Sequence, residues 1–449
     1  MPDLYAQNTD TGRGICLFDG DDIRLIVQDN DSDVVFVTFT SRPALDKNGT
    51  YNKLGFAQRL VERKKYSGVY FIAKWPHWWQ SPDLPIAEAI ARDLPFLRNA
   101  KRRLCYGGSM GGFGVLLSAS RIGCERGLVV APQVSMDPSI VPFENRWNED
   151  VEAIHFIEPD SRIGIGSNCQ YFVLYDKFHK LDNMHVSMLR GYPQIEFLSV
   201  PYGGHNILEF MLQIGVLKDF VRDVAFDDLH FDQLIRNIRV LRRGYTQYYE
   251  KMYLYAFEKG KKVTCGLVAK HWFAFDPGAL HAFKRYSKYL GEGRSDDSRE
   301  DEKTRFEALL EASDAYLAAG TDKVFGLQNR RLALYSLGRY TEALDVALQV
   351  CALQDSIFNN WRWAYACMNR LRRYQDIVDS CRTHFDSFKT EIRFLRAYFE
   401  ALVAAKASVD AIEIGKLLVA HPQAGLEDKE RVESVRDTIQ QTADPAPRA

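Results

Sequence analysis

The chain has 449 residues, enough for two or three domains, and its 46% of hydrophobic residues is ordinary for a globular protein. Its formal net charge of −1 gives no general reason to bind nucleic acid or an anionic membrane surface. No apolar stretch approaches the length of a membrane span, and the eight cysteines form no C-x-x-C pair. We therefore expect a cytoplasmic protein with no membrane span and no nucleic-acid partner.

The first half of the chain alternates strand-like and helix-like segments. Buried strands are expected over residues 34–39, 68–73, 103–106, 127–131, 171–175 and 195–200. Helices are expected over residues 55–66, 83–97, 112–122, 182–190 and 206–224. This alternation predicts parallel βαβ units in one α/β sheet covered on both faces. Residues 1–28 are expected to add one or two antiparallel edge strands.

Ser109 stands in the segment Gly107-Gly108-Ser109-Met110-Gly111, which follows a short apolar run and precedes a helical segment. A serine nucleophile needs this strand, tight turn and helix, because the turn lifts its hydroxyl above the sheet. The flanking glycines permit backbone angles that a side chain would forbid. The motif alone is weak, but its flanks fit, so Ser109 is the candidate nucleophile.

A serine hydroxyl needs a neighbouring base, and His205 is the candidate. It lies in Pro201-Tyr202-Gly203-Gly204-His205-Asn206, between the last predicted strand and a long helix. Two glycines beside a histidine suit a loop that lays an imidazole over the end of a parallel sheet. The alternative is a surface or helix-capping histidine.

Two aspartates compete for the role of the acid that orients the base. Asp176 directly ends the strand 171–175, and Asp182 lies where a helix is expected to begin. Since a helix-initiating aspartate is more simply an N-cap, Asp176 is favoured. His179 and His185 flank the same loop and are expected to be solvated.

The order serine, acid, histidine resembles the α/β-hydrolase superfamily over residues 34–224. The segment Tyr106-Gly-Gly-Ser-Met-Gly-Gly-Phe-Gly is also similar to a bacterial group found beside glycan-synthesis and glycan-export proteins, including accessory-secretion acetyltransferase-like proteins. The resemblance implies a serine esterase or acyltransferase that uses no cofactor and acts on an acylated small molecule or glycan.

The resemblance also implies an oxyanion hole made of two backbone N–H groups. One would come from Met110, the residue after the nucleophile, and the other from Thr40 or Ser41 after the strand 34–39. This loop departs from the lipase pattern, because Thr40-Ser41-Arg42-Pro43 lacks a run of glycines.

Three tryptophans follow another predicted strand in Lys74-Trp75-Pro76-His77-Trp78-Trp79. Trp75 and Trp78 are candidates for substrate binding, because tryptophans in a loop can stack on sugars or line an acyl pocket. A hydrophobic plug between sheet and helices is an equal alternative. Residues 132–169 show no clear strand and could form a lid or a plain surface excursion.

The chain is expected to divide into an α/β-hydrolase domain (1–225), a helical connector with a charged linker (226–302) and a helical domain (303–449). In the last, Leu337-Gly338-Arg339-Tyr340 returns as Leu371-Arg372-Arg373-Tyr374, 34 residues later. This spacing resembles tetratricopeptide repeats, whose helix pairs stack and commonly dock a protein partner. A helical bundle with accidental periodicity is the alternative.

Two functions from different classes remain in view. The first is a serine-dependent acyl hydrolase or acyltransferase with helical repeats that dock a partner. The second is a non-catalytic platform in a glycan-assembly or secretion complex. The presence of serine, histidine and acid favours the enzyme, because a platform does not need all three. A peptidase is less favoured, since no propeller or large cap is evident.

Overall fold

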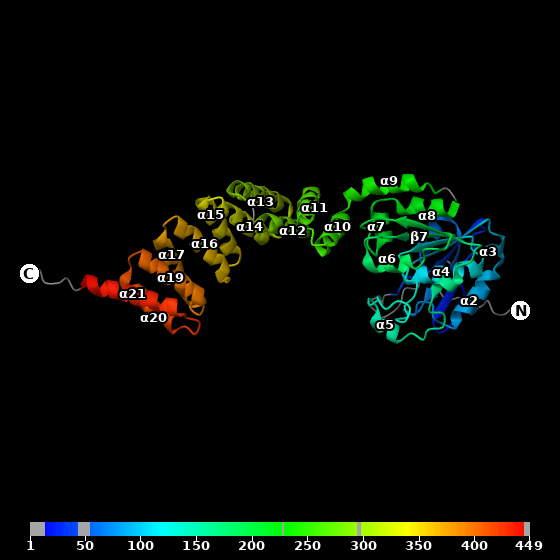
Figure 1. The fold of residues 1–449 in the computed structure, drawn as a ribbon, viewed down its shortest axis with the longest axis horizontal. Coiled ribbons are helices and arrows are strands. Elements are labelled where there is room, and N and C mark those ends of the chain that lie inside the picture. Colours follow the sequence, from blue (N-terminus) through cyan, green and yellow to red (C-terminus); the bar gives the residue numbers. More distant parts are fainter. Residues whose placement is uncertain (1–13, 44–53, 227–228, 294–297, 444–449) are drawn as a thin grey trace, which may run out of the picture. The chain divides into compact units, whose positions relative to one another are not determined.

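The computed structural model describes residues 14–43, 54–226, 229–293 and 298–443 (Figure 1). It divides the chain into two compact units, Met1–Lys259 and Gly260–Ala449. The boundary lies between α10 (Thr246–Glu258) and α11 (Lys262–Phe275), not at the expected positions near residues 225 and 302. Helices that the sequence assigned to a connector are therefore shared between the two units.

Within the described residues, the first unit holds an eight-stranded sheet in the order β1-β2-β4-β3-β5-β6-β7-β8. The strands are β1 (Ile15–Asp19), β2 (Ile23–Gln28), β3 (Val34–Phe39), β4 (Ser67–Ala73), β5 (Arg102–Gly108), β6 (Arg126–Val130), β7 (Gln170–Tyr175) and β8 (Ile195–Ser199). The six strands from β3 onward are parallel, and β1 and β2 are antiparallel. The expected α/β sheet with antiparallel edge strands is confirmed.

The strands β3, β4 and β7 bury both of their faces, which explains their near-continuous apolar sequences, whereas the edge strand β8 exposes Glu196. In β3, Val35, Val37 and Phe39 belong to one hydrophobic core, and Val34 and Phe36 belong to the other. This separation follows from the two-residue period of a strand, which turns successive side chains to opposite faces. The sheet is thus the middle layer between two cores.

Helices cover both faces of the sheet. The core containing Val35 includes residues of α2 (Asp83–Arg92), α4 (Met110–Ile122) and α6 (Lys180–Ser187). The opposite core includes residues of α1 (Gln58–Lys64), α7 (Ile207–Gln213), α8 (Leu217–Phe226) and α9 (Phe231–Leu241).

Two of the expected helices are each broken into two. Residues 83–97 form α2 and then α3 (Pro95–Asn99), since proline at the first helical position starts a new helix. Residues 206–224 form α7 and α8, which are interrupted at Gly215, where φ is 80°. A left-handed backbone at glycine is a common way to end a helix.

The excursion 132–169 contains little regular structure. It holds α5 (Asn148–Glu152), the 3₁₀ helix η1 (Ser161–Gly164) and an isolated antiparallel bridge between Ser135 and Asp160. The absence of a long strand or helix agrees with the sequence expectation for this interval.

The second unit is helical throughout its described residues. Its helices are α11, α12 (Leu280–Glu292), α13 (Arg299–Ala319), α14 (Lys323–Ser336), α15 (Tyr340–Leu353), α16 (Phe358–Arg370), α17 (Tyr374–Thr383), α18 (Phe385–Phe388), α19 (Ile392–Ala404), α20 (Ser408–Ala420) and α21 (Leu426–Ala443). The helices α15, α17 and α20 begin at Tyr340, Tyr374 and Ser408, so the 34-residue period of the sequence is a period of the structure.

The charged segment expected as a linker over residues 291–303 is shorter in the structure. Its first residues belong to α12, and its last belong to α13, which begins after a capping box between Ser298 and Asp301. Residues 294–297, in the middle of the predicted linker, lie outside the described residues.

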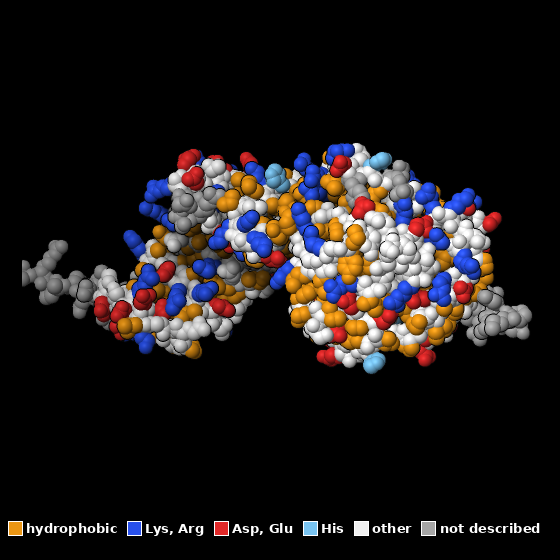
Figure 2. All heavy atoms as spheres, turned by 45° about the vertical axis from the view of Figure 1, so that its right-hand side comes forward, with side chains coloured by type: hydrophobic (Ala, Val, Ile, Leu, Met, Phe, Trp, Pro, Cys, Tyr) orange, Lys and Arg blue, Asp and Glu red, His pale blue; other side chains and the backbone are white. Residues whose placement is uncertain are grey.

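The surface carries both signs of charge. On the face drawn in Figure 2, basic and acidic side chains are interspersed with hydrophobic ones, in line with a net charge near zero. Within the described parts of the chain, no helix combines the length and hydropathy that a membrane crossing would require. All eight cysteines are free thiols.

Candidate active site

Ser109 lies at the turn between β5 and α4, with φ 55° and ψ −120°. A positive φ is costly for a residue with a side chain, and here the close packing of the turn imposes it. A Cβ on Gly107 would lie 2.4 Å from the carbonyl oxygen of Gly111, and a Cβ on Gly111 would lie 2.4 Å from that of Phe39. The two glycines of the motif are therefore required by backbone contacts, and the serine is held on a strained elbow.

His205 faces Ser109 from the loop after β8. Its Nε2 lies 3.1 Å from Ser109 Oγ, and 23% of its side chain is exposed. The loop reaches this position through left-handed backbone at Tyr202 (φ 66°) and Gly204 (φ 69°). The expectation that the Gly-Gly-His loop brings an imidazole to Ser109 agrees with the geometry.

The acid beside His205 is Asp182 and not Asp176. Asp182 Oδ2 lies 2.8 Å from His205 Nδ1, so Nδ1–H donates to the carboxylate and leaves Nε2 as an acceptor toward Ser109. Asp182 is fully buried in the first turn of α6, which it does not cap: the N-cap is His179. The prediction that Asp176 would contact His205 is therefore wrong, because Asp182 occupies that position.

Asp176 instead holds the loop that carries His205. Its Oδ1 accepts from the N–H of Phe178, and its Oδ2 accepts from the N–H of Gly204, each at 2.9 Å. Both carboxylate oxygens are thus occupied by backbone donors, and Asp176 is 3% exposed. A strand-end aspartate of this kind positions the histidine through its neighbour and does not contact the ring.

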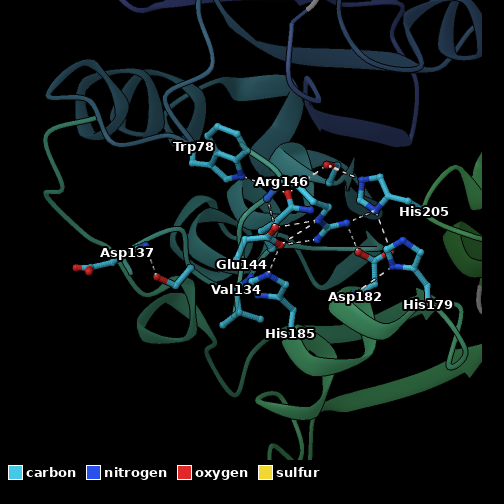
Figure 3. Close-up of polar contacts among 12 residues, drawn as sticks. Trp78, Val134, Asp137, Glu144, Arg146, His179, Asp182, His185 and His205 are labelled. Atoms are coloured by element: carbon cyan, nitrogen blue, oxygen red, sulfur yellow. Dashed lines mark hydrogen bonds and ion pairs between the residues drawn. The ribbon is translucent and has the colours of Figure 1, made fainter. Parts of the chain in front are cut away.

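Two further side chains contact the carboxylate of Asp182 (Figure 3). Arg146 Nη1 lies 2.7 Å from Asp182 Oδ1, and His179 Nδ1 lies 3.1 Å from Asp182 Oδ2. Arg146 comes from the excursion 132–169 and is flanked by the ring of Trp147, with Cζ 4.3 Å from its centroid. The excursion therefore forms part of the site.

A second carboxylate–histidine pair supports Arg146 from the other side. Glu144 Oε2 lies 2.6 Å from Arg146 Nη2 and 2.9 Å from His185 Nε2. His185 is fully buried, and its Nδ1 accepts from the N–H of Val134, which fixes the tautomer with the proton on Nε2. His185 is thus not solvated, contrary to the sequence expectation, because it anchors the excursion to α6.

The electrostatics of the site keep both carboxylates ionised. Burial opposes ionisation of Asp182, but hydrogen bonds from His179 and His205 outweigh it and hold the pKa of Asp182 well below its usual value. For Glu144 the same competition between burial and hydrogen bonds from His185 and Arg146 lowers the pKa to about 2. Asp182 is therefore a carboxylate at neutral pH, as an orienting acid must be.

The predicted oxyanion hole is revised at one of its two positions. Met110 is the first residue of α4, so its N–H has no acceptor within the helix. Thr40, however, donates its N–H to Phe71 O at 3.1 Å, and its hydroxyl accepts from the N–H of Ala73. The N–H of Thr40 is therefore used within the sheet, which leaves Ser41 as the candidate for the second oxyanion donor. Ser41 Oγ donates to Gly108 O at 2.8 Å, beside the nucleophile.

The tryptophans after β4 are packed into the unit. Trp78 is fully buried, and Trp75 donates its Nε1–H to Asp22 Oδ1 at 2.6 Å. Trp79, 1% exposed, donates its Nε1–H to the carbonyl of Met110 at 2.9 Å. This burial favours the plug alternative over stacking on a ligand.

Trp78 nevertheless reaches the nucleophile through one intermediate side chain. Its Nε1–H donates to Gln133 Oε1 at 3.2 Å, and the same oxygen lies 3.1 Å from Ser109 Oγ. Gln133 is fully buried. The indole N–H therefore fixes the orientation of an amide that contacts the candidate nucleophile.

Sequence reasoning missed the roles of Gln133, which contacts Ser109, of His179, which contacts Asp182, and of the side chains that join the excursion to α6: Glu144, Arg146 and His185. Their contacts span 36 residues between Arg146 and Asp182, and 41 between Glu144 and His185. The only local signal was a Glu-x-Arg-Trp segment in an irregular interval, which does not indicate a partner. Within the described residues, no group of three or more His, Cys, Asp or Glu is arranged to hold a metal ion.

No family model matches the chain, and no curated protein matches its sequence. Among solved structures, the chain is similar to a capsule O-acetyltransferase of Neisseria meningitidis serogroup A, with 12% identity and a TM-score of 0.34 over 49% of this chain and 98% of that one. It is also similar to XC6422 from Xanthomonas campestris, described as an α/β serine hydrolase without a lid, with 14% identity and a TM-score of 0.28 over 44% of this chain and 88% of that one.

A third similarity is to the tetratricopeptide domain of P58(IPK), with 14% identity and a TM-score of 0.25 over 54% of this chain and 68% of that one. At these values no residue role transfers from any of the three proteins. The chain itself combines an eight-stranded, mostly parallel sheet covered by helices with an all-helical region.

Proposed function

We propose that the first unit is a serine-dependent acyl hydrolase or acyltransferase in which Ser109, His205 and Asp182 act together. The observation that carries the proposal is one continuous chain of contacts from Ser109 Oγ through the imidazole to Asp182 Oδ2, at 3.1 and 2.8 Å. The strained backbone of Ser109 supports it independently, because a structural serine has no need of a left-handed elbow.

The chemistry follows from the tautomer that Asp182 selects. His205 Nε2 takes the proton from Ser109 as Oγ attacks an acyl carbon, and Asp182 stabilises the resulting imidazolium. The N–H groups of Met110 and Ser41 hold the oxyanion. The imidazolium then protonates the leaving group, and an ester of Ser109 remains.

In the second half of the cycle, His205 takes a proton from water or from an acceptor hydroxyl, which attacks the acyl-enzyme. Ser109 recovers its proton when the tetrahedral intermediate collapses. Water gives hydrolysis, and a sugar hydroxyl gives transfer. An ester of O-acetyl type on a glycan is the substrate class suggested by the likeness of the Ser109 segment to glycan-associated hydrolases.

The helical unit would serve this enzyme by docking a protein partner. The support is its 34-residue period, which is typical of stacked helix pairs that present an extended binding surface. The alternative function is a non-catalytic platform, in which the contacts of Ser109 and His205 would be a structural remnant.

A fluorophosphonate probe separates the enzyme from the platform. Intact-protein mass should show one adduct on the wild type and none on Ser109→Ala. Ser139→Ala, which changes an exposed serine in the excursion, should label like the wild type. Folded wild-type protein that takes up no adduct would count against the enzyme.

A further inference from the structure

A cavity of about 490 Å³ lies beside the last strand of the sheet, apart from Ser109. It is lined by β8, by α9 and by the residues that flank them: Lys177, Glu196, Phe197, Leu198, Ser199, Pro201, Ile235, Ile238, Arg239 and Arg242. Its volume is within the usual range for small-molecule sites. None of the functional residues proposed above lines it.

Three basic side chains and one acidic side chain line this cavity. Within the described residues, no ion pair engages Lys177, Arg239 or Arg242, whereas many other arginines of the chain are paired. The carboxylate of Glu196 accepts a hydrogen bond from Gln170 Nε2 at 2.9 Å, so one of its oxygens already has a partner outside the cavity lining. The cavity therefore has an excess of positive charge that the described protein does not neutralise.

In the part of the chain that the structure describes, two buried polar atoms at this cavity have no hydrogen-bond partner: Ser199 Oγ and Arg242 Nε. Since buried polar atoms are usually satisfied, these two atoms support the argument for a ligand that the excess of positive charge makes. The backbone adds a further donor. Val200 donates its N–H to Tyr175 O in β7. Along a strand, successive N–H groups point to opposite sides, so the N–H of Ser199 points away from β7, toward the free edge of β8.

The lining of the cavity also includes apolar side chains. Phe197 and Leu198 contribute from β8, and Ile235 and Ile238 contribute from α9. A ligand that matches this lining therefore carries negative charge together with an apolar or aromatic group. Phosphate is the anion whose several oxygens match two guanidinium groups, an ammonium and a hydroxyl donor at once.

We propose that this cavity binds a small molecule that carries a phosphate or diphosphate and an aromatic group. Arg239, Arg242 and Lys177 hold the phosphate oxygens, Ser199 Oγ donates to them, and the aromatic group packs on Ile235 and Ile238 of α9. The site is independent of the chemistry at Ser109, although Pro201 belongs both to the cavity wall and to the loop that carries His205.

Calorimetry with ADP, pyrophosphate and adenosine as probes tests the two halves of the site. ADP, which carries both a diphosphate and an aromatic base, should bind at least about tenfold more tightly than either fragment. Its affinity should fall as salt is raised, because charge–charge contacts are screened. The measurement is repeated on Ser109→Ala, which should bind ADP like the wild type, so that the result does not depend on catalysis.

Matched variants locate the binding. Arg242→Gln should lower the affinity for ADP by about tenfold, the usual loss for a charge-assisted contact. Arg243→Gln, which changes the exposed neighbour, should leave the affinity unchanged. Lys177→Gln, also at an exposed position, provides a second variant if Arg242→Gln does not fold.

Three results would overturn the assignment. The first is folded wild-type protein that binds no ADP at millimolar concentration. The second is equal affinity in the wild type, Arg242→Gln and Lys177→Gln. The third is an acidic peptide that binds with the same arginine dependence while ADP does not, which would assign the free edge of β8 to a peptide strand.

Discussion

Arg146 Nη1 lies 2.7 Å from Asp182 Oδ1, the carboxylate oxygen that does not face His205. One acid thus receives a hydrogen bond from the imidazole on one oxygen and from a guanidinium on the other. Arg146 belongs to the excursion 132–169, so a segment without regular strands contributes directly to the geometry of the site. This contact makes the excursion more than a plain surface loop.

Arg146→Gln should lower kcat by about tenfold and destabilise the protein by about 1–3 kcal/mol. The reason is that Glu144 and Asp182 would lose a charged partner while staying buried. Arg162→Gln is the control, because Arg162 pairs with Asp160 in the same excursion and lies more open to solvent. Ester turnover and thermal unfolding check both variants, and equal effects on kcat would contradict a specific role for Arg146.

Gly107→Ala should destabilise the protein by about 2–3 kcal/mol and abolish probe labelling, because the new Cβ would meet the Gly111 carbonyl at 2.4 Å. Gly108→Ala is the matched control: the nearest atom to its Cβ would be 3.6 Å away, an ordinary contact. Denaturant unfolding measures the difference. Equal stability of the two variants would mean that the elbow is not held as tightly as the structure indicates.

Trp78→Phe separates packing from substrate binding. Because Trp78 is fully buried, the substitution Trp78→Phe should lower the unfolding temperature. It should leave KM within about twofold, since only the core loses volume. The lost N–H also frees Gln133 Oε1, so a modest change in kcat is expected. An increase of KM without loss of stability would restore Trp78 as a substrate-binding residue.

Glu144 makes the stability of the protein sensitive to acid. Its pKa of about 2 in the folded state is below its usual 4.5, so its contribution is complete above pH 4.5 and is lost as pH falls toward 2. Glu144→Gln should therefore lose less stability than the wild type between pH 5 and about pH 2.5. Thermal unfolding across this range is the measurement, with Glu149→Gln, an exposed neighbour, expected to follow the wild type.

Much of the fold could be predicted because the signals are local. A strand buried on both faces needs a continuous apolar run, and β3, β4 and β7 each show one. The turn at Ser109 and the loop at His205 also carry glycines where the backbone is crowded or left-handed. Such constraints act over a few residues, and the sequence records them.

The acid could not be chosen this way. Asp176 follows β7 and Asp182 lies six residues later in the first turn of α6, and whether either carboxylate reaches His205 depends on how the connecting segment folds back. The partners from the excursion were equally hidden, since Glu144 and Arg146 meet α6 only through long-range packing. Side-chain direction after a turn and contacts across long loops are decided by tertiary structure.

The most direct test of the account compares the two aspartates by the rate of fluorophosphonate labelling at Ser109. Asp182→Asn should slow labelling by about 10³-fold, because the wrong tautomer of His205 would face the nucleophile. Asp176→Asn should slow it by about tenfold at most, because Asp176 acts only through the loop at Gly204. Labelling of Asp182→Asn at the wild-type rate, or a greater loss in Asp176→Asn, would contradict the proposed triad.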